Sequence, residues 1–209
     1  MSDFSNFLDI QTKTPWGRTL AEFASFCAPQ PASVILDIGC GPGLLPAIFT
    51  QRGCKAYGID YDFALLASHL ISSLVQADAL KLPFQSSTLR PGSGQAFNLV
   101  TVTNVLFLLD NPLRALKEWA RVLAPSGEIC LLNPSEKLSI TAATSLANER
   151  ELNGTARESL LNWAHNAETH FHWTEAEIRE LITQAGMQFL ETVLRVGPGF
   201  ARFVRAKLY

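Results

Sequence analysis

A glycine-rich turn carries the clearest chemical signal in the sequence. The segment LDIGCGPGLL (36–45) places Asp37 near the end of an apolar run and follows it with Gly39, Gly41 and Gly43. Glycines allow the backbone to turn tightly and to approach a ligand closely, and a helix that starts there presents unpaired N–H groups. The segment therefore predicts a binding site for a nucleotide-like ligand.

The spacing of these glycines argues against a dinucleotide. The dinucleotide fingerprint requires glycines at its first, third and sixth positions, and the sixth position counted from Gly39 is Leu44. A pyrophosphate site is therefore disfavoured. An NAD-dependent oxidoreductase stays as an alternative, because it shares the acidic residue after a second strand.

Further candidate ligand-binding residues follow later strand-like runs of the chain. They are Asp60, Tyr61, Asp78, Ala79 and Asn104. A carboxylate such as Asp60 is able to accept two hydrogen bonds from a ribose diol. Each residue also has an ordinary structural explanation, since strand-end acids often cap helices or turns, Tyr61 could belong to the core, and Asn104 could cap a helix.

The elements that must position these residues alternate between strand-like and helical segments. Short apolar runs occupy residues 34–38, 56–59, 74–77, 97–103 and 128–133, and helical segments are expected at 43–52, 62–72 and from 111 to a turn at 125–127. Alternation of this kind predicts a parallel sheet with helices on both faces. The final runs, 187–196 and 200–208, are separated by three residues and can pair only antiparallel. We expect an α/β fold with a doubly wound, mostly parallel seven-stranded sheet and an antiparallel last strand.

Taken in order, these motifs resemble those of class I S-adenosylmethionine-dependent methyltransferases over roughly residues 34–133. The segment FNLVTVTNVLFLLDNP (97–112) looks like its counterpart in small-molecule methyltransferases of the ubiquinone and menaquinone biosynthesis type. Many of those enzymes carry histidines where this chain has Phe107 and Leu108. The resemblance implies a Rossmann-like methyltransferase fold, a single domain over residues 1–209, S-adenosyl-L-methionine as cofactor and S-adenosyl-L-homocysteine as product.

The resemblance also implies a role for each candidate residue beyond the glycine turn. It assigns Asp60 to the ribose, Tyr61 to the adenine face and Asp78 to the adenine amino group. It assigns the backbone amide of Ala79 to a ring nitrogen, and Asn104 to the methionine part. Every recognised residue concerns the cofactor, so a non-catalytic binding protein with this fold remains an alternative.

Segments outside the sheet are expected to enclose the acceptor. A leading helix over about 14–28 carries Arg18, which could meet the methionine carboxylate or simply lie exposed. A helical insert over about 139–173 ends in NWAHNAETHFHW (162–173), whose aromatic residues and histidines could line the acceptor pocket, supply a base or pack as a lid. Two of these histidines are close in sequence, but no third ligand is in sight, so no metal is predicted.

Composition narrows the class of acceptor. The 209 residues have a formal net charge of −2 and no basic run, which gives no electrostatic footprint for nucleic acid. Nucleic-acid amino-methylating enzymes carry Asp or Asn, two prolines and an aromatic residue after the fourth strand, whereas this chain has Asn104, Val105 and Leu106. A small-molecule acceptor is therefore expected. No catalytic base is assigned, because one is needed only if the acceptor must lose a proton.

The sequence also indicates a compartment. Asp3 and no basic residue precede the first apolar residues, and apolar stretches fall short of the roughly 18 residues that span a bilayer. We therefore expect a cytoplasmic protein without a membrane span. The four cysteines form no CxxC motif and are expected to be reduced and mostly buried.

Overall fold

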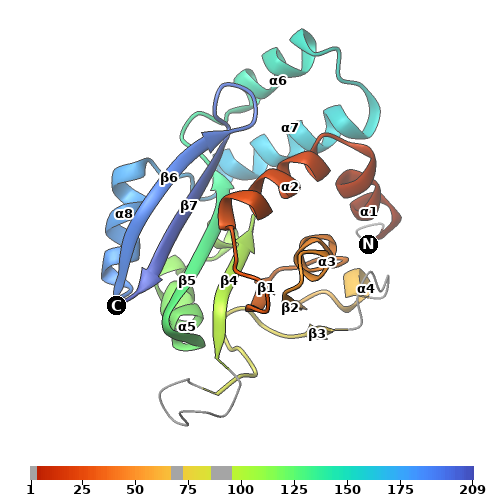
Figure 1. The fold of residues 1–209 in the computed structure, drawn as a ribbon. Coiled ribbons are helices and arrows are strands. Elements are labelled where there is room, and N and C mark those ends of the chain that lie inside the picture. The colour runs from red at the N-terminus through yellow and green to blue at the C-terminus, as the bar shows by residue number, and fades with distance from the viewer. Residues whose placement is uncertain (1–3, 67–72, 86–95) are drawn as a thin grey trace.

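The fold is built around one sheet, seen in a computed structural model that describes residues 4–66, 73–85 and 96–209 (Figure 1). The strands of the described residues are β1 (Val34–Ile38), β2 (Lys55–Asp60), β3 (Leu74–Gln76), β4 (Phe97–Thr103), β5 (Leu123–Pro134), β6 (Met187–Arg195) and β7 (Ala201–Leu208). The helices are α1 (Phe4–Lys13), α2 (Trp16–Cys27), α3 (Leu44–Gln51), α4 (Phe63–Leu66), α5 (Pro112–Arg121), α6 (Ile140–Glu149), α7 (Gly154–Thr169) and α8 (Glu175–Gln184), with a 3-10 turn η1 (Leu106–Leu108).

The sheet has the order β3-β2-β1-β4-β5-β7-β6. Strands β1 to β5 run parallel, and β7 lies antiparallel between β5 and β6. This arrangement confirms the predicted fold class. The order reverses beside β1, and open α/β sheets bind ligands at such a switch point, outside the carboxyl ends of the strands.

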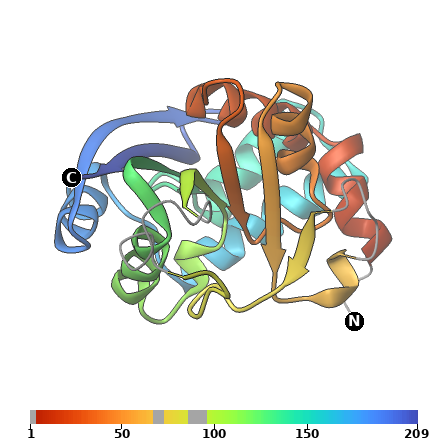
Figure 2. The ribbon, with the colours of Figure 1, turned by 60° about the horizontal axis from the view of Figure 1, so that its bottom comes forward.

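The sheet is buried on both faces, which explains its continuous apolar strands. Alternate residues of β1 enter different cores: Leu36 packs with α5 and α8, whereas Ile35 packs with α2 and α3. Trp119 is the largest fully buried side chain of the first core, and Phe23 and Phe49 are fully buried in the second. Figure 2 shows α5 and α2 on opposite sides of the sheet. The two layers hold the strand ends in fixed positions.

Two elements differ from the sequence prediction. The structure has a helix, α1, ahead of the predicted leading helix, where no element was predicted, and this helix packs against α2 and α7. Strand β5 begins at Leu123, so the predicted turn at residues 125–127 lies inside it as an irregularity, where the pairing register with β4 shifts and Ser126 has φ +60°. The strand predicted over 128–133 was too short, because Leu123, on the N-terminal side of the bulge, also pairs with Phe97 of β4.

Other predictions have a mixed outcome. All four cysteines are buried and free, as predicted, and α8 begins with a capping box of Thr174 and Glu177. The predicted helix over 62–72 begins as α4, but residues 67–72 lie outside the described residues. Within the described ranges, no helix has the length and apolar character required to cross a membrane.

A partly buried hydrogen bond joins α5 to the segment after β3. The indole N–H of Trp119 donates to the carbonyl oxygen of Ala79 at 2.8 Å. We expect Trp119→Phe to lower the free energy of unfolding by about 1–2 kcal/mol, because the partly buried carbonyl loses its partner. Urea denaturation measures this difference, with the exposed Tyr209→Phe as control. Equal midpoints for Trp119→Phe and wild type would contradict the assignment.

Candidate active site

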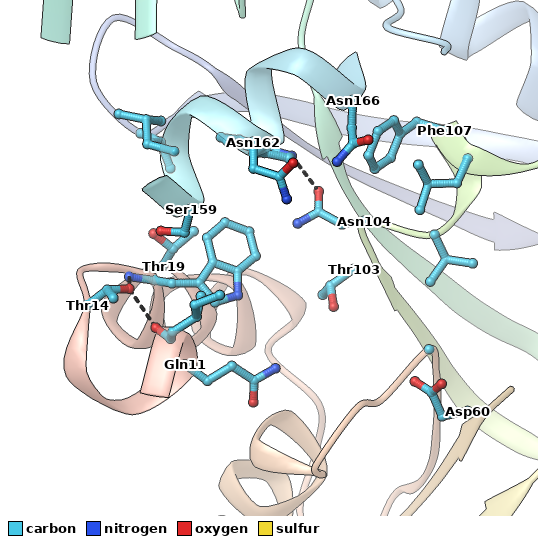
Figure 3. A pocket seen from close by; sticks show the side chains of 18 of the residues that line it. Gln11, Thr14, Thr19, Asp60, Thr103, Asn104, Phe107, Ser159, Asn162 and Asn166 are labelled. Atoms are coloured by element: carbon cyan, nitrogen blue, oxygen red, sulfur yellow. Dashed lines mark hydrogen bonds between the residues drawn. The ribbon is translucent and has the colours of Figure 1, made fainter. Parts of the chain in front are cut away.

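A cavity of about 550 Å³ lies where the carboxyl ends of the parallel strands face the helical layer. Its floor comes from the ends of β1, β2, β3 and β4, and its walls come from α1, α2 and α7 (Figure 3). Most of the surface that lines it is apolar, with separate polar side chains placed around it. Ligand sites of enzymes have this character.

Six of the nine predicted cofactor-binding residues line this cavity. They are Gly39, Asp60, Tyr61, Asp78, Ala79 and Asn104. Asp37, Gly41 and Gly43 are not among its lining residues. The structure therefore brings together at one place residues that the sequence spreads over 66 positions, from 39 to 104.

The glycine turn needs glycine for geometric reasons. Gly39, Gly41 and Gly43 have φ values of +72°, +52° and +86°, in the left-handed region that other residues rarely adopt. A Cβ atom on Gly39 would also collide with the side chain of Val105. Gly43 occupies the N-cap position of α3. The turn thus lets β1 end directly against the cavity floor.

Asp60 is held in place by the backbone at the end of β2. Its Oδ2 atom accepts a hydrogen bond from the Gly41 amide at 2.8 Å, and its Oδ1 atom accepts one from the Asp62 amide at 2.9 Å. Each carboxylate oxygen keeps a further lone pair. Asp60 is therefore a preoriented carboxylate on the cavity wall, able to accept two more hydrogen bonds from a ligand.

The residues around β3 form the rim of the cavity. Tyr61 is 78% exposed, so it does not belong to the core. The Oδ1 atom of Asp78 accepts a hydrogen bond from the Leu80 amide at 2.8 Å. Asp78 therefore caps a local turn, as strand-end acids often do. Ala79 is fixed through its carbonyl by Trp119. Within the described residues, the second oxygen of Asp78 and the Ala79 amide have no hydrogen-bond partner.

Asn104 connects the sheet to the helical layer. It has φ +56°, a conformation that asparagine tolerates better than most residues, and its Oδ1 atom accepts from the indole N–H of Trp163 at 3.1 Å. The ring of Trp163 in turn packs edge to face against the ring of Trp16, with 5.7 Å between the ring centroids. The alternative that Asn104 caps the following turn is wrong, because Val105 is the N-cap of η1.

Sequence reasoning missed the polar contribution of two helices. Gln11 of α1 is buried and lines the cavity, and Ser159, Asn162 and Asn166 of α7 also line it. The three α7 residues recur at spacings of three and four, which places them on one face of a helix. The spacing of the three α7 residues is visible in the sequence, whereas Gln11 belongs to a helix that was not predicted.

Other predicted candidates lie elsewhere. Arg18 is exposed and does not line the cavity, which agrees with its ordinary explanation. His165, His170 and His172 are exposed and are likewise outside the lining. In the part of the chain that the structure describes, no cluster of three potential metal ligands occurs.

Asp37 lies beneath the turn and not in the cavity. It is 1% exposed, and its Oδ1 atom accepts a hydrogen bond from the hydroxyl of Thr101 at 2.8 Å. Burial raises the pKa of Asp37 to about 8, opposed by the Thr101 hydrogen bond and reinforced by the nearby charge of Asp60. The Asp37 carboxyl therefore joins β1 to β4 in a largely protonated state near neutral pH.

Comparison with known proteins agrees with this geometry. Residues 36–131 match the family model described as a methyltransferase domain. The chain is 33% identical over 101 residues to the ubiquinone biosynthesis O-methyltransferase of Pseudomonas aeruginosa and 28% identical over 103 residues to the demethylmenaquinone methyltransferase of Corynebacterium kroppenstedtii. The first match covers 46% of this chain and the second 48%, and each covers 42% of the relative's length.

A third relative has a different kind of name. The "Probable tRNA methyltransferase 9B" of Mus musculus is 31% identical over 131 residues, which is 60% of this chain and 26% of that protein. The chain thus spans less than half the length of these curated relatives.

Solved structures show the same fold along nearly the whole chain. A SAM dependent methyltransferase from Aquifex aeolicus superposes with a TM-score of 0.65 at 17% identity and covers 100% of both chains. The magnesium protoporphyrin IX methyltransferase of Synechocystis, solved with bound SAH, superposes with a TM-score of 0.65 at 16% identity and covers 92% of this chain and 83% of that one. The chain therefore has the class I methyltransferase fold. Residues 36–131 match the methyltransferase domain model, so the predicted resemblance is confirmed.

The buried carboxyl of Asp37 predicts a pH-dependent stability. Between about pH 4 and pH 8 the unfolded chain ionises this group while the folded protein retains the proton. The folded state then binds more protons, so the contribution of Asp37 to stability falls as pH rises through this window. Asp37→Asn removes the effect, and its stability relative to wild type should rise with pH by up to about 1.4 kcal/mol per unit.

Urea unfolding of both proteins at several pH values between about 5 and 9 measures the difference. The exposed Asp110→Asn serves as control, and its stability relative to wild type should stay constant with pH. A constant difference for Asp37→Asn as well would contradict the raised pKa.

Proposed function

We propose that this protein transfers a methyl group from S-adenosyl-L-methionine to a small-molecule acceptor. The observation that carries the proposal is the position of the Asp60 carboxylate. It lies at the end of β2, is oriented by the glycine turn and lines the cavity. Five more of the predicted cofactor-binding residues line the same cavity, namely Gly39, Tyr61, Asp78, Ala79 and Asn104. The matched family and the relatives named above support the reaction class.

The residues present fit this cofactor. Asp60 would accept hydrogen bonds from the ribose diol, Asp78 would accept one from the adenine amino group, and the Ala79 amide would donate to a ring nitrogen. Tyr61 would cover the adenine from the rim, where it is exposed. Gly39 and Asn104 both line the cavity and would border the methionine part.

The cofactor, when bound, supplies a sulfonium-activated methyl group. The protein then has to align the acceptor with that group, because an in-line displacement gains most from orientation. Trp16, Trp163 and Asn104 hold α2, α7 and the end of β4 together around the reaction space. These contacts limit the positions that an acceptor is able to take and reduce access of water.

The walls of the cavity restrict the kind of acceptor. Helices α1, α2 and α7 stand over the strand ends, so the acceptor must enter a space enclosed by helices and not a broad open surface. The chain has a formal net charge of −2, which does not favour a polyanionic partner. A small molecule is therefore the preferred acceptor, and a nucleic acid is not expected.

The cofactor assignment is tested by calorimetric titration with S-adenosylmethionine, S-adenosylhomocysteine and NADH. We expect binding of the two sulfur nucleotides in the micromolar range and no comparable binding of NADH. Asp60→Ala should weaken both by at least about tenfold, because a hydrogen-bonded charged group on the ligand wall is typically worth about 1.5–3 kcal/mol.

The matched control is Glu180→Ala, which removes an exposed carboxylate on α8, away from the cavity lining. It should leave the affinities unchanged. Tight binding of NADH alone, or equal affinity of Asp60→Ala and wild type for S-adenosylhomocysteine, would show that the cofactor assignment is wrong.

A further inference from the structure

Gln11 lines the cavity and has a hydrogen-bonding atom without a partner. The residue is 7% exposed, and its Oε1 atom is fully buried without a hydrogen-bond partner in the described structure. A buried carbonyl oxygen left unpaired costs about 1–3 kcal/mol. Figure 3 shows Gln11 and Thr14 on one side of the cavity, with Asp60 and Thr103 on the other.

The opposite wall adds two more unused amides. Asn162 and Asn166 of α7 line the cavity, and no hydrogen bond of either side chain occurs within the described residues. Figure 3 shows both near Asn104, at the end of β4. Asn104 has its oxygen engaged by Trp163, and the two α7 amides add further donors and acceptors at this end.

The surroundings of these amides are apolar and carry little charge. The helical wall contributes Leu146, Leu160 and Val196, and η1 contributes Phe107. Of the described lining residues on this side, only Arg150 is charged, and it is exposed at the end of α6. Neutral amides in an apolar wall offer hydrogen bonds but no compensating charge, so they favour an uncharged ligand.

We propose that Gln11, Asn162 and Asn166 form the acceptor subsite and that it takes an uncharged, largely apolar molecule carrying a hydroxyl or amino group. This inference rests on the proposed function, because it assigns the strand-end side of the cavity to the cofactor. The O–H or N–H group of the acceptor donates to Oε1 of Gln11. The asparagine amides, which both donate and accept, bind the remaining polar atoms and direct the apolar body toward Leu160 and Phe107.

Selectivity follows from the unpaired atom. An analogue whose donor is blocked by methylation leaves the buried Gln11 oxygen without a partner, and a site built to bind a polar group discriminates strongly against such an analogue. An anionic group at the same place would face the negative end of the Gln11 carbonyl. The subsite therefore prefers neutral donors.

The test uses protein saturated with S-adenosylhomocysteine and two matched pairs of probes, phenol with anisole and aniline with N,N-dimethylaniline. Dissociation constants come from amide chemical-shift titration. We expect wild type to bind the donor-bearing member of each pair about fivefold more tightly, the effect of about 1 kcal/mol. Gln11→Met, which keeps the size and removes the oxygen, should abolish this preference.

Thr12→Val is the matched control, since Thr12 lies on the same helix, is exposed and does not line the cavity. It should keep the preference of wild type. Equal affinities within each pair for wild type, no binding of any probe, or a preference that survives Gln11→Met would overturn the inference. If Gln11→Met instead weakens S-adenosylhomocysteine tenfold, Gln11 serves the cofactor and the inference is wrong. Failure of wild type to bind S-adenosylhomocysteine would overturn the proposed function itself.

Discussion

The hydrogen bond from the Gly41 amide to Oδ2 of Asp60 is the contact on which the rest of the site depends. It joins the turn after β1 to the end of β2, so the two strand ends at the switch point of the sheet hold one geometry. The left-handed glycines make this contact possible, because a side chain at Gly39 would collide with Val105. The Gly41 amide thus couples the shape of the turn to the direction of the carboxylate, which the Asp62 amide also holds.

The helical layer is attached to this floor through Asn104. Its side chain reaches Trp163 of α7, and Trp163 packs on Trp16 of α2. The strand end, the insert and the leading helices therefore share one connected set of contacts. Because the cavity wall and floor are linked in this way, the amides of α1 and α7 have defined positions relative to Asp60, which a loosely attached lid could not provide.

The parts of the structure that the sequence predicted well are those governed by local patterns. Buried strands read as apolar runs, and the glycine turn has a fixed spacing. Helix α1 escaped prediction because its residues FSNFLDIQTK give a weak pattern by themselves, and its contacts are with distant α7. The bulge in β5 resembled a chain-reversing turn because Pro, Ser and Gly serve both purposes.

Side-chain roles were harder to predict than positions. Asp37 lies two residues before Gly39 in the sequence, yet its side chain points toward the neighbouring strand β4. There it accepts a hydrogen bond from the hydroxyl of Thr101. The histidines of the insert attracted attention by their chemistry, but the face of α7 that lines the cavity carries asparagines instead. Which face of a helix meets a ligand depends on long-range packing, which a single sequence does not reveal.

The position of β7 bears on the order in which the protein folds. This strand follows all other elements in the described chain, yet it lies between β5 and β6 and pairs with both. It also carries Arg202, which binds Glu136 at 2.8 Å and the carbonyl of Trp173, at the two ends of the insert. Chains emerge from the ribosome with the N-terminal part first. The half-sheet that holds the glycine turn, with helices α1 and α2, therefore leaves the ribosome before β7, and the contacts of Arg202 with both ends of the insert are able to form only after this last strand has been synthesised.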